Sequence, residues 1–142
     1  MKHFVIICLS FVAAAYCHTV SAQCNSPLLF TASKTSYLDS TNKEIRTVDE
    51  PSSIVIDGNG ITISWADDKV MTGKITTMEC KWSLPFKEGK SVMRSSLSNG
   101  SNEERAVTMR LEGKGGIVTF LITIDEDPNK RIRLVADKFQ MK

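Results

Sequence analysis

Residues 106–136 read AVTMRLEGKGGIVTFLITIDEDPNKRIRLVA. Apolar and polar residues alternate with period two on both sides of two turn clusters, GKGG and DEDPNK, which predicts three antiparallel strands in a meander. One face of this meander is expected to carry Val107, Met109, Leu111, Val118, Phe120, Ile122, Ile124, Ile132 and Leu134. The other face would carry Thr108, Arg110, Thr119, Thr123, Arg131 and Arg133. The stretch therefore predicts an all-β protein.

The remaining chain extends the same pattern in both directions. Strands are expected over 28–37 (one strand or two short ones), 44–48, 54–56, 61–65, 70–84 and 90–97. Between 57 and 60 the sequence Asp-Gly-Asn-Gly predicts a tight hairpin. The phase of the 70–84 run slips, which predicts a bulge or bend around residues 73–77. We predict a single-domain antiparallel meander of about eight or nine strands, as an up-and-down barrel or a β-sandwich.

The first 22 residues have the pattern of a cleaved signal peptide. A short basic opening precedes the apolar run 4–16, and Val20-Ser21-Ala22 provides small residues for the peptidase. The run is too short to span a bilayer as a helix. Cleavage leaves residues 23–142, a length typical of one domain, with no membrane span. We therefore expect a secreted or periplasmic protein.

Two of the four cysteines, Cys24 and Cys80, lie beyond the signal peptide, and in an oxidising compartment they are expected to form one disulfide. Metal binding is the alternative, but neither cysteine has a second Cys or a His nearby. The only histidines, His3 and His18, fall in the signal segment. No metal site is predicted on this basis. Two unpaired thiols remain the other alternative.

The composition argues against several classes of function. A formal net charge of +2 gives no overall attraction for nucleic acid. Residues 23–142 contain no histidine to serve as a base for a Ser or Cys nucleophile, and Gly113-Lys-Gly-Gly116 lies between strands, unlike a phosphate-binding loop. The carboxylates lie mostly in turns; Asp125-Glu-Asp127 suits solvated acids better than a cation site. We predict neither an enzyme nor a cofactor.

The candidate ligand-binding residues are Trp65, Trp82 and Phe120, because aromatic side chains often line apolar pockets. Core packing is the alternative for each of them. The chain is similar to the lipocalins as a secreted meandering barrel; their Gly-x-Trp near the first strand is missing, so the likeness concerns architecture and carries no residues across. The sequence thus predicts a non-catalytic binding module, a lipocalin-like cup for a small apolar ligand.

A second hypothesis is a protein-interaction or inhibitor module that acts through loops or an exposed sheet face. Six basic residues gather on the predicted meander and its neighbours: Arg110, Lys114, Lys130, Arg131, Arg133 and Lys138. They suit an acidic partner, although interleaved acids favour ordinary surface charges that resist aggregation. Asn99-Gly100-Ser101 also matches the acceptor pattern for N-glycosylation in an exposed loop.

Overall fold

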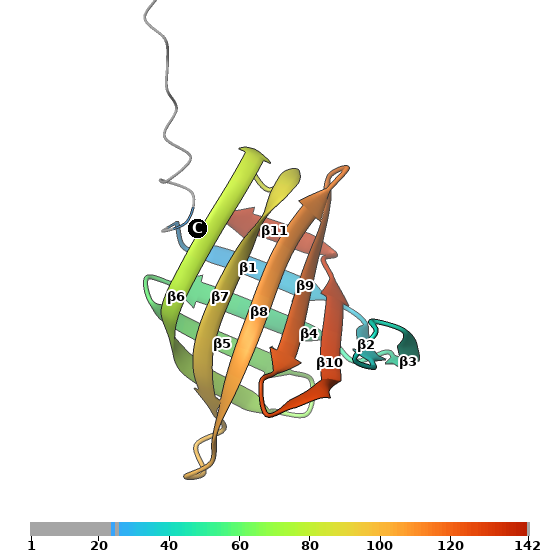
Figure 1. The fold of residues 1–142 in the computed structure, drawn as a ribbon, viewed down its shortest axis with the longest axis vertical. Helices are drawn as coiled ribbons and strands as arrows, with labels where there is room; N and C mark the ends of the chain where they lie inside the picture. Colours follow the sequence, from blue (N-terminus) through green and yellow to red (C-terminus); the bar gives the residue numbers. More distant parts are fainter. Residues whose placement is uncertain (1–23, 25, 142) are drawn as a thin grey trace, which may run out of the picture.

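The computed structural model describes Cys24 and residues 26–141. The described residues form eleven β-strands and no helix (Figure 1). In chain order the strands are β1 (Leu28–Ala32), β2 (Thr35–Leu38), β3 (Glu44–Val48), β4 (Ser52–Asp57), β5 (Gly60–Trp65), β6 (Val70–Leu84), β7 (Glu88–Ser98), β8 (Glu104–Lys114), β9 (Ile117–Ile124), β10 (Asp127–Val135) and β11 (Lys138–Met141). The predicted signal peptide, residues 1–22, lies outside the described residues.

All strands belong to one antiparallel sheet, in which each strand from β4 to β9 pairs with the next one along the chain. The all-β meander predicted from the sequence is therefore confirmed. Strands β8–β10 form the predicted three-strand meander, and Leu111, Phe120 and Leu134, predicted to share one face, lie opposite one another in register. All three side chains are buried. In the described part of the chain, no helix is long and apolar enough to cross a membrane.

The strand order does not describe a closed barrel. The order runs β11-β1-β4-β5-β6-β7-β8-β9-β10-β2-β3 and has two ends, so this part of the prediction is not confirmed. The reason lies in two long segments that are each interrupted: residues 28–38 are divided into β1 and β2, and residues 127–141 are divided into β10 and β11. β1 pairs with β4 and β11, whereas β2 pairs with β3 and β10. The β1–β2 segment thus changes its neighbours where it is interrupted.

The predicted count of eight or nine strands is also wrong, because the structure has eleven. Residues 28–37 form two strands with a break at 33–34, one of the two predicted alternatives, and residues 138–141, for which no strand was predicted, form β11 after a break at 136–137. The predicted break after residue 48 is found at residues 49–51, where Pro51 has no amide hydrogen for the ladder. At the other two breaks the paired segments stay together: the Asp137 amide donates to the Thr31 carbonyl at 2.8 Å. The register also continues without slip, from Thr31 opposite Lys138 to Thr35 opposite Leu134.

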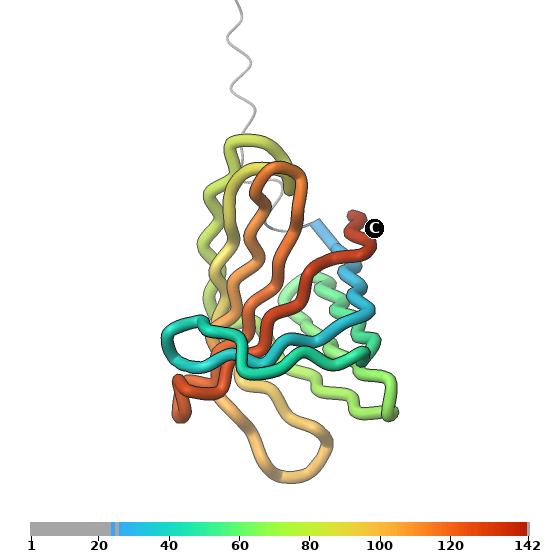
Figure 2. Tube along the Cα trace, turned by 90° about the vertical axis from the view of Figure 1, so that its right-hand side faces the viewer, coloured from blue at the N-terminus to red at the C-terminus, as the bar shows by residue number. Residues whose placement is uncertain are grey.

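The sheet curves over itself into two layers with the core between them. Figure 2 shows β6–β10 in one layer and β1, β4 and β5 in the other, with the segment of β1 and β2 passing from one to the other. Residues without exposed surface come from both layers, including Phe30, Ile54 and Ile63 on one side and Met109 and Phe120 on the other. Alternate positions are buried in β1, β4, β5, β7, β8 and β9, as the period-two pattern requires.

Two local predictions are confirmed. Asp57 pairs with Gly60 across a tight turn, in which Gly58 takes the left-handed φ of 59° that a tight hairpin favours. In β6 the register shifts between Ile75 and Thr77, inside the predicted bulge region. At Gly73, beside this shift, β7 approaches closely: an added Cβ would overlap the carbonyl oxygen of Ser96 and lie 2.7 Å from the Ser95 hydroxyl. A side chain at this position would therefore require the two strands to move apart.

Candidate functional site: a cavity at one end of the sheet

A cavity of about 410 Å³ lies at the end of the sheet that contains the β5–β6 turn. This volume lies within the range of small-molecule sites. Its walls come from strands or turns that are far apart in the sequence, and the lining residues are Tyr37, Glu50, Trp65, Asp68, Lys69, Val70, Met71, Asn99 and Ile132. We call this the mouth cavity. It is open to solvent and borders the hydrophobic core.

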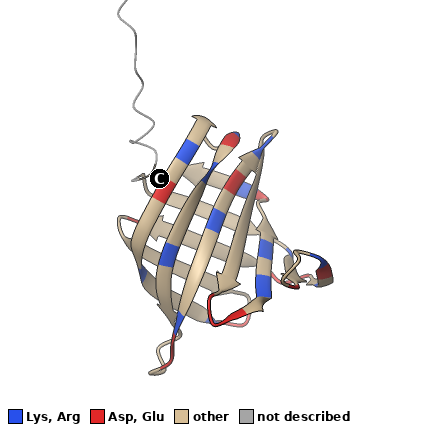
Figure 3. Cartoon of the chain, in the orientation of Figure 1, with Lys and Arg blue, Asp and Glu red and all other residues tan. Residues whose placement is uncertain are grey.

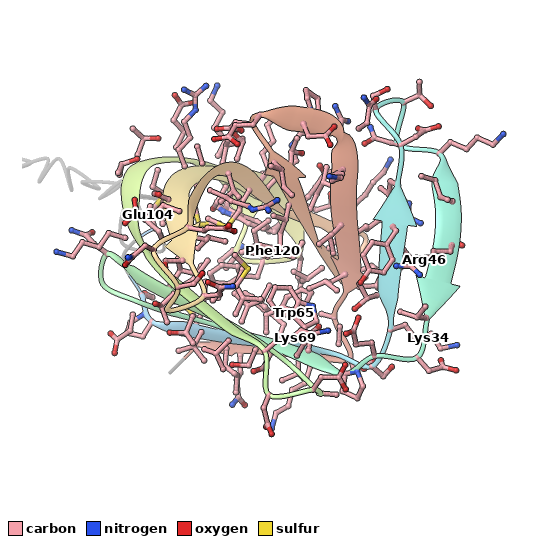
Figure 4. The ribbon with its side chains drawn as sticks, turned by 90° about the horizontal axis from the view of Figure 1, so that it is seen from below. Lys34, Arg46, Trp65, Lys69, Glu104 and Phe120 are labelled. Carbon is pink, nitrogen blue, oxygen red and sulfur yellow. A yellow bond between two sulfur atoms is a disulfide. The ribbon has the colours of Figure 1, made fainter. Side chains whose placement is uncertain are left out.

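One wall of the mouth cavity is apolar and continuous with the core. Trp65, Met71 and Ile132 are partly buried and pack against the core cluster. Register places Met71 opposite Ile63, two residues before Trp65, and Ile132 opposite Tyr37. All three side chains line the same cavity. Figure 4 shows Trp65 and Phe120 within the curve of the sheet, with Lys69 close to Trp65. An apolar ligand in the cavity would therefore extend the existing core.

The other wall is polar and centres on Tyr37 in β2. Its hydroxyl donates to Glu50 Oε2 at 3.3 Å, and the Thr35 hydroxyl donates to the Glu50 carbonyl at 3.3 Å. Burial raises the pKa of the Tyr37 phenol, and the charge of Glu50 and this hydrogen bond raise it further. The positive charges of Arg46 and Lys69 lower it. Tyr37 is thus a protonated hydrogen-bonding group at neutral pH.

Two cations stand near this polar wall. The Arg46 guanidinium carbon lies 4.3 Å from the centre of the Tyr37 ring, a cation–π arrangement. Lys69 ends the β5–β6 turn, where its carbonyl accepts from the Trp65 amide at 2.9 Å. Asp68, which precedes it, has a left-handed φ of 56°. The turn therefore holds the backbone of Lys69 next to that of Trp65, and both residues line the cavity.

Of the three predicted ligand-binding residues, the structure places Trp65 in the wall of the mouth cavity and the other two in the core. Trp82 is 4% exposed, and its Nε1 donates to Ser91 Oγ at 2.8 Å. Phe120 has no exposed surface, and its ring centre lies 5.8 Å from that of Phe30. For Trp82 and Phe120, the core-packing alternative describes their surroundings.

The end of the sheet near Trp82 is closed by aromatic packing. Phe86, in the β6–β7 turn, lies 5.1 Å from Trp82 and 4.8 Å from Phe139, measured between ring centres. Phe86 has a φ of 51°, an uncommon conformation for a bulky residue, which turns it toward these rings. This packing explains why Trp82 is covered while Trp65, at the opposite end, borders a cavity.

Cys24 and Cys80 are brought together as predicted. Their sulfur atoms lie 2.06 Å apart and their Cα atoms 6.0 Å apart, which is the spacing of a disulfide. Cys80 also accepts a hydrogen bond from Ser91 at 3.3 Å, the same hydroxyl that accepts from Trp82. The cysteine pair thus fastens the start of the described chain beside the aromatic end of the sheet.

The acidic turn considered as a cation site uses its carboxylates locally. Asp125 accepts from the Thr108 hydroxyl at 2.8 Å, and Asp127 lies 3.1 Å from the Lys130 ammonium. Among the described residues, no three His, Cys, Asp or Glu side chains are grouped to hold a metal ion. These contacts agree with the interpretation of the cluster as turn carboxylates.

Sequence reasoning did not identify Tyr37, Glu50, Met71 or Ile132 as site residues. The alternation placed Ile132 on the inner face, which is correct, but gave no sign that this position borders a cavity. Tyr37 and Glu50 come from a weakly patterned region around the β3 strand. No local signal marks them, because their role depends on the pairing of β2 with β10.

No family model matches the chain, and no curated protein or solved structure is significantly similar to it. The function is therefore inferred from the residues and their geometry.

Proposed function

We propose that the protein is a non-catalytic, extracytoplasmic binding module whose mouth cavity holds a small apolar ligand with one polar group. The observation that carries this proposal is the apolar wall of Trp65, Met71 and Ile132, which continues the core out to an open cavity. Burying apolar surface against such a wall contributes about 25 cal/mol per Å². The polar wall would orient the ligand.

The chemistry of the two walls suggests how the ligand is held. The indole of Trp65 offers a flat apolar face, and Met71 adapts to an irregular shape. Tyr37, Glu50 and Lys69 supply hydrogen-bonding groups on the opposite side. A hydroxyl or carbonyl group of the ligand would replace its hydrogen bonds to water with hydrogen bonds to these side chains. A few placed polar groups in a mainly apolar site are typical of ligand pockets.

A lipocalin-like cup is the architecture we propose for this site. Two features support it: the unslipped register of the β1–β2 segment along the β10–β11 segment, and the bond between Asp137 and Thr31 across the breaks. In this view the β1–β2 and β10–β11 segments are two long, bent strands that close the curve of the sheet. The mouth cavity is then the open end of the cup, and the Trp82 end is its base.

Binding without catalysis is favoured by the absence of histidine from residues 23–142 in the sequence. Tyr37 has a raised pKa, so its phenol is not activated as a base or nucleophile. An extracytoplasmic location is supported by the spacing of Cys24 and Cys80, since disulfides persist in oxidising compartments.

The proposal is tested with the neutral probe N-phenyl-1-naphthylamine, whose fluorescence rises in apolar surroundings, titrated against residues 23–142. We expect saturable binding that weakens by about tenfold in Trp65→Ala, because the indole supplies much of the apolar wall. Ile132→Asn should weaken it similarly. The matched control is Leu84→Ser, which alters an exposed apolar side chain outside the cavity.

Equal affinity of wild type and Trp65→Ala would refute the proposed site. A panel of ester, phosphate, glycoside and peptide substrates tests the non-catalytic part. Turnover that survives repurification and disappears on mutating one acidic residue, with the fold intact, would show an enzyme instead.

A second candidate, a protein-interaction module, is favoured by one observation. Ile117, Val135 and Met141 are 61, 48 and 52% exposed, and they line a groove of about 560 Å³ with Phe86 and Phe139. Exposed apolar patches often mark interaction surfaces. Analytical ultracentrifugation tests whether copies of the protein associate through this groove. Self-association that is abolished by Val135→Ser would favour this candidate, whereas a monomer at high concentration would argue against association between copies.

A further inference from the structure

The outer face of the meander carries an ordered row of side chains. Arg110 in β8 lies opposite Leu121 in β9, and Leu121 lies opposite Arg133 in β10. These positions alternate with the buried Leu111, Phe120 and Leu134, so they face away from the core. A leucine thus lies between two guanidinium groups on the outside of the sheet.

The β2–β3 turn makes this row one side of a groove. Asn42 Oδ1 accepts from Arg131 Nη1 at 2.7 Å, and Glu44 accepts from Arg133 Nη2 at 2.9 Å, so the turn is held against β10. Leu38, at the end of β2, is 2% exposed and lines the same groove. The groove has a volume of about 420 Å³, the size of a small-molecule site.

The groove combines an apolar floor with an excess of positive charge. Leu121 and Ile117 provide the apolar surface, and the buried Leu38 lies at its edge. Arg110, Lys114 and Arg133 outnumber the single acid Glu112 in the lining, and an excess of one cation remains when the Glu44 partner of Arg133 is counted. Figure 3 shows basic positions on β8 and β10, the strands on either side of β9.

The existing ion pairs leave this positive charge available. Arg110 lies 3.7 Å from Glu112, but the two side chains are 49 and 44% exposed, and such pairs contribute little. Lys114 has no acid within 4.0 Å among the described side chains. Both cations could therefore pair with an anionic group from outside.

We propose that this outer groove binds a small amphipathic anion. The apolar body lies on Leu121 and Ile117, and a carboxylate or sulfonate pairs with Arg110 and Lys114. A guanidinium binds such a group through paired, charge-assisted hydrogen bonds. The site is independent of the mouth cavity, because Leu121 faces away from the core that the mouth cavity adjoins.

The test uses decanoate as the probe, with residues 23–142 studied by isothermal titration calorimetry and by amide chemical shifts. Binding should weaken by about tenfold or more in Arg110→Gln/Lys114→Gln, because two charge-assisted contacts are removed. Leu121→Ala should weaken it through the apolar floor. The control Lys81→Gln, an exposed cation on β6, should leave the affinity unchanged. Shifts should concentrate in the amides of β8–β10 and the β2–β3 turn.

Two further probes separate the parts of the proposal. Decyltrimethylammonium, which has the same apolar chain and the opposite charge, should bind much more weakly, as should hexaglutamate, which has charge without an apolar body. Undiminished decanoate binding by the double variant, shifts confined to the mouth cavity, or no decanoate binding up to its solubility would each overturn the inference. Equal affinity for hexaglutamate would overturn it in favour of a nonspecific basic surface.

Discussion

Phe120 is the residue on which both layers of the sheet converge. It has no exposed surface and packs on Phe30 from the opposite layer. We expect Phe120→Ala to lower the free energy of unfolding by about 3–5 kcal/mol, because it leaves a cavity in a filled core. Urea denaturation measures this loss. Ile117→Ala, at an exposed position of the same strand, is the control and should change stability by only about 0.5 kcal/mol. A loss below about 1 kcal/mol for Phe120→Ala would contradict its central place in the core.

Tyr37 gives a direct spectroscopic report on the mouth cavity, because it is the only tyrosine in residues 23–142. We expect the tyrosinate absorbance to titrate with a midpoint above the ordinary pKa of 10.0, since burial and Glu50 both favour the neutral phenol. Glu50→Gln should lower that midpoint. Glu79→Gln, which changes an exposed acid on β6, is the matched control and should leave it unchanged.

The same shift makes stability depend on pH in a defined direction. The folded pKa is higher than the unfolded one, so the folded protein keeps the phenol proton longer. This contribution is complete below about pH 10 and is lost as the pH rises through the folded pKa. A tyrosine midpoint at or below 10.0 in the native protein would mean that Tyr37 is freely solvated.

At the scale of elements, the β6–β7 pair depends on Gly73. Its backbone lies against Ser96 and Ser95 of β7, beside the register shift at Ile75. We expect Gly73→Ala to cost about 1–3 kcal/mol, because the new methyl group must push the two strands apart. Gly60→Ala is the matched control in β5, where the added Cβ would lie 3.3 Å from the Asp57 carbonyl oxygen and small adjustments relieve it. Equal midpoints of urea unfolding for the two variants would show that the strands separate more easily than this geometry implies.

At the scale of the whole molecule, the cysteine pair joins the start of the described chain to β6. Cys24 and Cys80 are 56 positions apart, and closing a loop of that size stabilises the fold by about 4 kcal/mol through the entropy of the unfolded chain. We expect the intact mass of the exported protein to show a chain that begins at Gln23 and gains two hydrogens on reduction. Reduction, or the double change Cys24→Ser/Cys80→Ser, should lower the free energy of unfolding by about that amount. Two titratable thiols in the native, non-reduced protein would contradict the pairing.

The sequence by itself determined the all-β class, the meander of β8–β10, the hairpin at Gly58 and the bulge before Thr77. These features are local. Alternation of side chains assigns a residue to one face of its strand, and glycine or a phase slip marks where the strand turns or bends. The partnership of Cys24 and Cys80 was also predictable, because residues 23–142 contain no other cysteine.

Only the tertiary structure decided where the sheet opens and what lies at its two ends. Trp65 and Trp82 both occupy strand positions that suit core packing, but Phe86 covers one and the other borders the mouth cavity. The row of Arg110, Leu121 and Arg133 and the meeting of Tyr37 with Ile132 likewise depend on register between strands. The physical reason is that alternation fixes the face of a residue without fixing its partner, and pairing between distant strands is set by the curvature and packing of the whole sheet.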